Sequence, residues 1–310
     1  MSWQRGIANV LVRLMVRRRL RSWRPGQAGA AFVRGIFGQP RWLRARRARL
    51  ARVTKVVDAP VQGEWVHPLD GVVDSGRTIL YLHGGGYIFC SEETHRPITT
   101  TLANAARARV FAPRYRLAPE HPFPAAVDDA LASAEWLFTQ GVDPARTVVA
   151  GDSAGGGLAL ALLLARRDRG LAPMAGAYLL SPWTDLAATG GTIVSNDGAD
   201  AMFIGHRIGT FAREYLGNAP ATDPLASPHY AEKAGLPPLL IQVSTQEVLL
   251  DDARRLDASA RAAGVEVTLQ TWDDLPHVWQ MFTPFLPEAR DALGRAATWI
   301  SARVPSRPGH

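Results

Sequence analysis

The sequence of 310 residues has little of what marks a disulfide-stabilised, metal-binding or membrane-spanning protein. Its single cysteine, Cys90, excludes an intrachain disulfide and suits a reducing compartment, so we expect a cytoplasmic location. No Cys/His cluster has the spacing of a zinc site, and we expect neither a metal nor another cofactor. The plainest apolar helical run, residues 158–164, is too short to span a bilayer.

Acidic residues are missing from the first 55 positions, which hold fourteen arginines and one lysine. This segment therefore carries +15, whereas the whole chain carries +7, so residues 56–310 carry 7 − 15 = −8. Apolar residues within it repeat at helical spacing, at Ile7, Val10, Leu11, Leu14 and Met15. The pattern predicts an amphipathic helix with arginines mostly on its other face.

Two glycine-framed motifs, each after an apolar strand-like run, are the most informative features present. The run Gly151-Asp152-Ser153-Ala154-Gly155 fits G-x-S-x-G between a predicted strand at 147–150 and a predicted helix from 158. Ser153 would then stand exposed in a strained strand-to-helix turn, where a nucleophile is placed. Either motif alone is commonly a simple turn, but the two in this order favour acyl transfer.

The first motif, His83-Gly84-Gly85-Gly86, follows a predicted strand at 78–82. Successive glycines allow backbone N–H groups to converge on one point, as in an oxyanion loop. The first helical N–H after the serine adds a further donor at the positive end of the helix dipole. We therefore expect an oxyanion hole formed by Gly85, Gly86 and Ala154.

A serine nucleophile needs a base, and the order serine, acid, histidine places both partners downstream. Among the eight histidines this favours His277, in the loop after the predicted strand at 265–272 and before a helix near Pro287. Glu247 and Asp251 both follow the predicted strand at 238–244, and either can serve as the acid by chemistry. Position at the strand's carboxyl end favours Glu247, whereas Asp251 also fits the first turn of a helix.

Five segments together resemble the bacterial hormone-sensitive-lipase-like esterases over residues 53–304: residues 83–87, 115–126, 151–156, 181–186 and 223–228. The resemblance implies an α/β-hydrolase fold, with a mostly parallel central sheet flanked by helices and a helical cap. It places the acid about thirty residues before the histidine, which is Glu247, with a glutamate replacing the common aspartate and Asp251 left as the alternative.

The predicted organisation is one doubly wound catalytic domain at 53–304, preceded by an N-terminal helical segment at 1–52 and followed by a tail at 305–310. The resemblance implies that residues 1–52 and an insertion near 185–225 form the cap over the acyl pocket. In that arrangement Ile7, Leu11 and Leu14 would pack over the pocket mouth.

Two other interpretations of the basic segment remain. A basic amphipathic helix also binds anionic membrane surfaces, so peripheral membrane contact through residues 1–52 stays open. Nucleic-acid binding is disfavoured, because no recognition motif accompanies the charge. A secretory signal is disfavoured as well, since Arg13 interrupts the apolar run and three arginines, Arg17–Arg19, follow it.

The sequence thus predicts a serine carboxylesterase for a small-molecule ester of short to medium acyl length. Ser153 would attack the carbonyl, His277 would transfer the proton, and Glu247 would orient the imidazole. Amide or lactone hydrolysis by the same residues is an alternative, as is a non-catalytic ligand-binding module on the same fold. The natural substrate, stereoselectivity and oligomeric state are left open.

Overall fold

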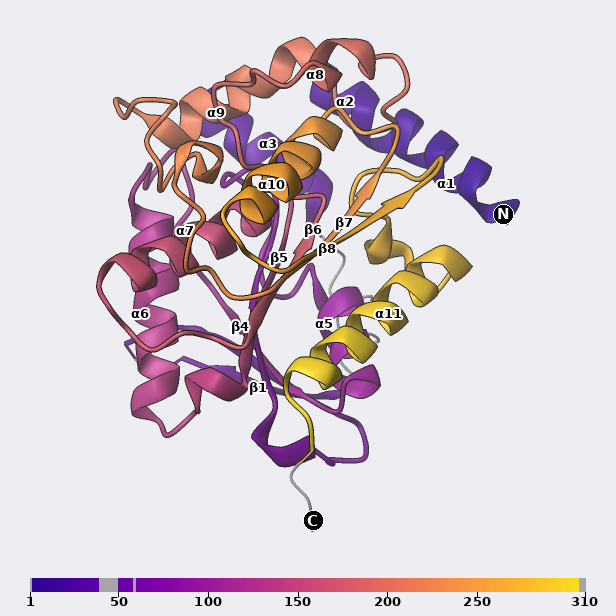
Figure 1. Cartoon of the computed structure of the whole chain (residues 1–310). Helices are drawn as coiled ribbons and strands as arrows, with labels where there is room; N and C mark the ends of the chain where they lie inside the picture. The colour runs from indigo at the N-terminus through magenta and orange to yellow at the C-terminus, as the bar shows by residue number, and fades with distance from the viewer. Residues whose placement is uncertain (1, 39–49, 58–59, 307–310) are drawn as a thin grey trace.

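The computed structural model describes residues 2–38, 50–57 and 60–306, which build an eight-stranded sheet with helices on both faces (Figure 1). The strand order is β1-β2-β4-β3-β5-β6-β7-β8. β2 is antiparallel to β1 and β4, and every other neighbouring pair is parallel. The strands are β1 (Arg52–Val56), β2 (Gly63–His67), β3 (Thr78–Leu82), β4 (Arg109–Pro113), β5 (Thr147–Asp152), β6 (Gly176–Leu180), β7 (Leu239–Ser244) and β8 (Val267–Trp272).

Helices cover the two faces of this sheet in separate groups. α5 and α11 pack on one face, and α6, α7 and α10 pack on the other. The described helices are α1 (Gln4–Val12), α2 (Arg18–Arg21), α3 (Gln27–Phe37), α5 (Arg96–Ala105), α6 (Ala125–Thr139), α7 (Ala154–Asp168), α8 (Thr192–Ser195), α9 (Ile208–Leu216), α10 (Leu250–Ala262) and α11 (Pro287–Arg303). The predicted α/β fold, its strands and its helix near Pro287 are confirmed.

Each face of the sheet has its own apolar core, because side chains alternate along a strand. In β3, Leu80 and Leu82 enter the core beneath α6 and α7, whereas Ile79 and Tyr81 enter the core beneath α5 and α11. All four side chains are fully buried. A strand that is apolar on both faces is what a parallel strand covered by helices requires.

The N-terminal helices and the segment containing α8 and α9 lie together at one end of the sheet (Figure 1). Arg17 donates hydrogen bonds to the carbonyl oxygens of Asp197 (2.8 Å) and Asp200 (2.7 Å). The ring of Trp23 stacks on that of Phe211 with centroids 4.3 Å apart. The segments expected to form the cap, 1–52 and 185–225, are therefore in contact, although residues 1 and 39–49 of the first lie outside the described residues, as do 307–310 of the tail.

α1 continues through a π-helical turn at Arg13–Arg17 into α2. Ile7, Leu11 and Leu14 are 41, 45 and 61% exposed, whereas Ala8 and Val12 are buried. The expectation that Ile7, Leu11 and Leu14 pack over the pocket mouth was therefore wrong. The periodicity identifies residues that share a face, but it does not say which face meets the protein.

Candidate active site

Ser153 occupies the turn between β5 and α7 in a backbone conformation with φ 54° and ψ −122°. A side chain in this region is strained and persists only where its surroundings fix it. The neighbouring glycines make the turn sterically feasible. A Cβ on Gly151 would lie 2.2 Å from the carbonyl oxygen of Gly155, and one on Gly155 would lie 2.1 Å from that of Leu82.

Glu247 and His277 come from the loops after β7 and β8 and meet in the interior. His277 Nδ1 lies 2.5 Å from Glu247 Oε2. The other carboxylate oxygen, Oε1, accepts hydrogen bonds from Ser244 N (2.7 Å) and Ser181 Oγ (2.8 Å). These contacts fix the carboxylate, which in turn orients the imidazole.

The electrostatic surroundings of His277 favour its protonated form. Burial alone lowers the pKa of the imidazole, but the carboxylate of Glu247 outweighs it, and Asp200 and Asp152 add to the same effect, so the pKa is raised above 6.5. His277 Nε2 is buried and has no hydrogen-bond partner among the described residues. A free, basic nitrogen at this point can accept a proton from a nearby hydroxyl.

Asp251, the alternative acid, lies elsewhere. Its Oδ2 accepts a hydrogen bond from Thr192 N at 3.0 Å, and its Oδ1 lies 3.7 Å from Arg254. Asp251 therefore connects the start of α10 to α8 and makes no contact with His277. The structure brings Glu247, and not Asp251, to the histidine.

The glycine loop after β3 is joined to the serine turn through Asp152. The Asp152 carboxylate accepts hydrogen bonds from Gly84 N (3.0 Å) and Tyr81 Oη (2.7 Å), and it lies 3.1 Å from His95 Nε2. A Cβ on Gly84 would lie 2.2 Å from the same carboxylate, so only glycine allows this approach. One buried carboxylate thus fixes the loop relative to Ser153.

The three expected oxyanion donors lie around Ser153. Gly85 and Gly86 have φ values of +116° and +59°, which favour glycine, and both line the same cavity as Ser153. Their N–H groups make no hydrogen bond to any residue that the structure describes. Ala154 is the first residue of α7, where an N–H group has no acceptor within the helix.

A cavity of about 270 Å³ joins Ser153 and His277. Its walls are mostly apolar and come from four parts of the chain: Val12, Val16 and Phe37, then Phe89 and Cys90, then Met202 and Phe203, and finally Val278, Met281 and Phe282. A second, narrow cavity of about 10 Å³ also borders Ser153 and is lined by Trp183 and Phe211. No group of three or more candidate metal ligands occurs within residues 2–38, 50–57 and 60–306.

Asp200 and Phe203 belong to this site but carry no signal in the sequence. Asp200 Oδ2 accepts a hydrogen bond from Val248 N (2.9 Å), next to Glu247, and its Oδ1 accepts from Phe203 N (2.9 Å). The Phe203 ring lies edge-on to His277, with centroids 4.8 Å apart. The insertion therefore contacts both the acid loop and the histidine, an arrangement that only the folded chain shows.

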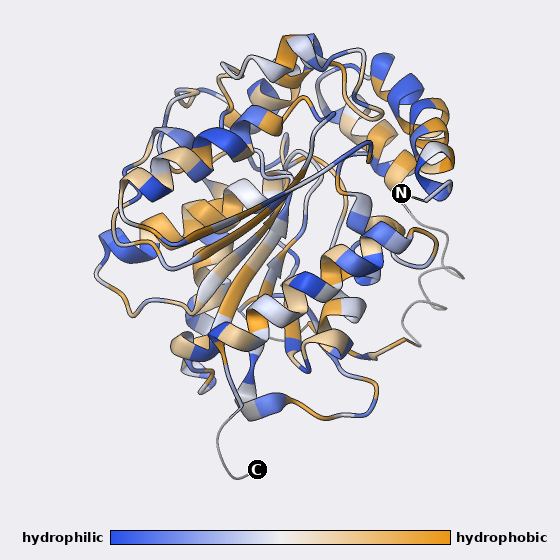
Figure 2. Cartoon of the chain, turned by 45° about the vertical axis from the view of Figure 1, so that its right-hand side comes forward, coloured by the Kyte–Doolittle hydropathy of each residue, from blue (hydrophilic) through white to orange (hydrophobic). Residues whose placement is uncertain are grey.

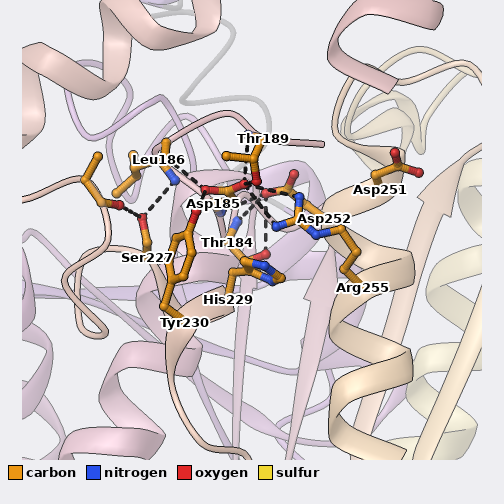
Figure 3. Close-up of polar contacts among 12 residues, drawn as sticks. Thr184, Asp185, Leu186, Thr189, Ser227, His229, Tyr230, Asp251, Asp252 and Arg255 are labelled. Atoms are coloured by element: carbon orange, nitrogen blue, oxygen red, sulfur yellow. Dashed lines mark hydrogen bonds and ion pairs between the residues drawn. The ribbon is translucent and has the colours of Figure 1, made fainter. Parts of the chain in front are cut away.

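A second buried polar cluster lies between the loop after β6 and the start of α10 (Figure 3). Asp252 Oδ2 accepts hydrogen bonds from the N–H groups of Thr184 (2.7 Å) and Asp185 (2.9 Å). Burial raises the pKa of Asp252 to about 7, against the opposing effect of these two hydrogen bonds. Asp185 is also buried, but hydrogen bonds from Thr189 and Arg255 outweigh burial and lower its pKa. The cluster ties the loop that follows Ser181 to α10.

A family model described as alpha/beta hydrolase fold matches residues 79–281 of this chain. An acetyl-hydrolase of Streptomyces hygroscopicus is 45% identical over 237 residues, which cover 76% of this chain and 78% of that protein. An esterase of Acinetobacter venetianus is 34% identical, covering 79% of this chain and 80% of that protein.

Solved structures are similar over nearly the whole chain. One is an esterase from the bacterial hormone-sensitive lipase family, with a TM-score of 0.88 and 38% identity, covering 98% of this chain and 99% of that one. Another, an esterase/lipase from an uncultured bacterium, has a TM-score of 0.87 and 38% identity, covering 99% of this chain and 100% of that one.

Proposed function

This chain belongs to the alpha/beta hydrolase fold family, among the bacterial hormone-sensitive-lipase-like esterases, and from that premise we propose that it hydrolyses short- to medium-chain acyl esters with Ser153, His277 and Glu247. Ester hydrolysis is the activity that its relatives' names share. The observation that carries the choice of residues is the 2.5 Å contact between His277 Nδ1 and Glu247 Oε2. The opposite nitrogen of the imidazole, Nε2, has no hydrogen-bond partner among the described residues, and His277 and Ser153 line the same cavity.

In the proposed reaction, His277 Nε2 removes the proton from Ser153 Oγ as the oxygen attacks the ester carbonyl. The resulting imidazolium is stabilised by Glu247, and it then protonates the leaving alkoxide. Water then attacks the acyl-enzyme while His277 removes its proton, the bond between the acyl carbon and Ser153 Oγ breaks, and the imidazolium returns the proton to Ser153 Oγ as the carboxylic acid leaves. The raised pKa of His277 strengthens the imidazole as the base that removes the serine proton.

The N–H groups of Gly85, Gly86 and Ala154 would stabilise the negative charge that forms on the carbonyl oxygen. The hydrogen bond from Gly84 N to Asp152 supports this role, because it holds the glycine loop beside the serine before substrate arrives. Donors that are already in place cost no reorganisation during the reaction, and removing one typically costs roughly 10²–10³-fold in turnover.

The walls of the cavity support a limit on substrate size. A cavity of about 270 Å³ accommodates an acyl group of a few carbons within apolar walls. In this proposal residues 1–52 and the insertion near 185–225 act as the cap, and residues 53–304 form the catalytic domain. Val12 and Val16 from the first segment and Met202 and Phe203 from the second close the cavity above Ser153.

The test is hydrolysis of p-nitrophenyl esters of increasing acyl length by the purified chain, beside a matched anilide and a lactone. We expect kcat/KM to be highest for short to medium acyl groups and to fall once the acyl chain exceeds the cavity. Efficient turnover of the anilide or lactone with poor turnover of every ester would overturn the ester assignment. Binding of the esters without hydrolysis would indicate a ligand-binding module.

A further inference from the structure

One face of the N-terminal helix carries most of an uncovered apolar surface. Of the 14 large hydrophobic side chains that are exposed among the described residues, six lie between residues 3 and 15. We call them the apolar stripe: Trp3, Ile7, Val10, Leu11, Leu14 and Met15, which are 41 to 70% exposed. Figure 2 shows orange apolar positions along this helix at the edge of the molecule. Soluble monomers rarely leave such a contiguous patch uncovered unless it serves binding.

The opposite face of the same helix is held largely by polar contacts. Arg5 donates to the carbonyl oxygen of Asp273 (2.9 Å), and Asn9 donates to that of Asp274 (3.1 Å). Arg13 donates to the carbonyl oxygen of Ala199 (2.5 Å). A surface helix ordinarily buries its apolar face and exposes its polar one. Here much of the polar face contacts the protein and the apolar face is exposed. This reversal indicates that the apolar face is available for binding.

Arginines continue this surface beyond the stripe. Arg18, Arg19, Arg21 and Arg24 are exposed and form no ion pair with a residue that the structure describes. Beside them lies an open cavity of about 500 Å³, the arginine groove, lined by Arg13, Arg17, Arg18, Arg21, Ile204, His206 and Arg207. Residues 2–38 hold eight arginines and no acidic residue. Three of the eight, Arg5, Arg17 and Arg34, form ion pairs with carboxylates elsewhere in the chain, so the uncompensated charge lies on the exposed arginines named above.

We propose that the apolar stripe and the arginine groove dock this protein on an anionic phospholipid surface. The stripe would lie among the outer parts of the acyl chains, and the arginines would lie at the level of the phosphates, as basic amphipathic helices do at a bilayer surface. No helix among the described residues is long and apolar enough to cross a bilayer, so the helix lies along the surface.

Charge favours lipid over a second copy of the chain as the occupant. Two copies paired through this face would bring their unpaired arginines together, and like charges repel. An anionic headgroup layer supplies the opposite charge and also covers the apolar stripe. A polyanion in water would neutralise the arginines but leave the stripe exposed.

The docking surface adjoins the catalytic cavity. Val12 and Val16 line that cavity from the inward side of the same helical segment that carries Leu11 and Leu14 outward. The helix would therefore separate the lipid from the Ser153 cavity by its own thickness. Esters dissolved in the lipid layer that the helix contacts would then be concentrated close to this cavity.

The experiment is flotation of the purified full chain with vesicles of phosphatidylcholine alone, or of phosphatidylcholine mixed with phosphatidylglycerol. We expect binding to the anionic vesicles, weaker binding at high salt, and little binding to the neutral ones. Arg18→Gln with Arg21→Gln should weaken the affinity by about fivefold per arginine, and Leu11→Gln with Leu14→Gln should weaken it further.

Matched control variants separate this site from overall charge and hydrophobicity. Arg107→Gln with Arg169→Gln removes two exposed arginines outside the segment, and Leu69→Gln removes a leucine that is 55% exposed. Both should bind like the wild type. Hydrolysis of a soluble short ester should be unchanged in every variant, which also shows that each one is folded.

Two outcomes would overturn the proposal. The first is equal binding, or none, to neutral and anionic vesicles. The second is a stable dimer that Leu11→Gln with Leu14→Gln converts to a monomer, because a second chain would then cover the stripe. If the wild type does not hydrolyse a soluble ester, the proposed activity is contradicted. Vesicle binding tests the docking surface separately, whatever the activity.

Discussion

α7 and α1 are both apolar helices near Ser153, yet they are held in opposite ways. In α7, 13 of 15 residues are buried, including every residue from Ala154 to Arg166. In α1, only Ala8 and Val12 of nine residues are buried, and hydrogen bonds hold much of the inward face. A helix that is buried on all sides is part of the core, so changing it destabilises the whole fold. A helix held by a few polar contacts can be changed without unfolding the rest of the protein.

The cavity of the proposed active site reflects this difference in its two halves. The sheet-borne half supplies Ser153 and His277 from the loops that follow β5 and β8, and Glu247, from the loop after β7, contacts His277. The helix-borne half supplies Val12, Val16 and Phe203. Changes in the first half should affect the chemical step, and changes in the second should affect which substrate is accepted.

Ser153→Ala should have the largest effect, because it removes the nucleophile from the sheet-borne half. We expect turnover to fall by about 10⁶-fold with the melting temperature preserved, and covalent labelling by an organophosphonate to disappear. Ser195→Ala, an exposed serine in α8, is the control and should behave like the wild type. Labelling that persists in the Ser153→Ala variant would place the nucleophile elsewhere.

Glu247→Gln should come next, with a loss of roughly 10³–10⁴-fold in kcat, because an amide no longer fixes the productive tautomer of His277. Asp251→Asn tests the other carboxylate and should cost far less, since Asp251 contacts Thr192 and Arg254. Steady-state kinetics on one soluble ester compares the two. The opposite ranking would transfer the role of the acid to Asp251.

Val16→Phe should alter selectivity rather than chemistry, because Val16 lines the cavity from the helix-borne half. We expect kcat/KM for a longer acyl ester to fall by about 10–200-fold, with a much smaller change for the acetyl ester. Leu14→Phe is the matched control, as Leu14 faces solvent two positions away. A uniform loss across acyl lengths would show that the two halves are not separable.

Asp200→Asn tests the contact between the two halves of the cavity, because Asp200 lies in the insertion and influences His277. Ionised Asp200 contributes to the raised pKa of His277, and the base is active only when neutral, so activity falls as the pH drops through that pKa. Removing the charge should shift the acidic limb of the kcat/KM profile to lower pH. Glu247 and Asp152 remain, so the shift should be partial. A loss of rate with an unmoved limb would mean that Asp200 acts on structure alone.

Asp252→Asn should have the smallest effect, on stability and not on rate. The pKa of Asp252 is about 7 in the folded protein and 3.8 when unperturbed, so the unfolded chain releases its proton first as the pH rises. Wild-type stability therefore falls between about pH 4 and pH 7, by up to roughly 1.4 kcal/mol per pH unit. An asparagine has no proton to release, so the melting temperature of the variant relative to wild type should rise from pH 5 to pH 8.

Much of the fold could be predicted from short segments of the sequence. The apolar runs at 78–82 and 147–150 predict strands that the structure shows as β3 and β5, and the glycines around Ser153 predict a turn that a Cβ would block. These features depend on residues adjacent in the chain. The choice of His277 as the base rested on the order of the motifs and on its place after the strand predicted at 265–272, and its role stays a prediction.

Features that depend on the tertiary arrangement could not be read in this way. The periodicity of Ile7, Leu11 and Leu14 identifies a common face, but the carbonyl groups of Asp273 and Asp274 that attract the other face lie more than 260 positions away. In the sequence, Asp200 resembles any polar residue of a loop, and it is distinguished only in the folded chain, by its hydrogen bonds from Val248 N and Phe203 N and by its effect on the pKa of His277. The geometry favours Glu247 over Asp251 because Glu247, and not Asp251, contacts His277, which is 30 positions away in the chain.

The hydrogen bonds of Arg17 have a thermodynamic consequence. They join the N-terminal segment to the backbone of Asp200, whose carboxylate holds Val248 N beside Glu247. If a lipid surface stabilises the helix in this position, the part of that free energy transmitted through Asp200 favours the observed position of Glu247, and coupling between two equilibria is reciprocal. Some ester analogues should bind better when Glu247 is held in this position. Vesicles should then raise the affinity for such an analogue, and the analogue should raise the affinity for vesicles by the same factor.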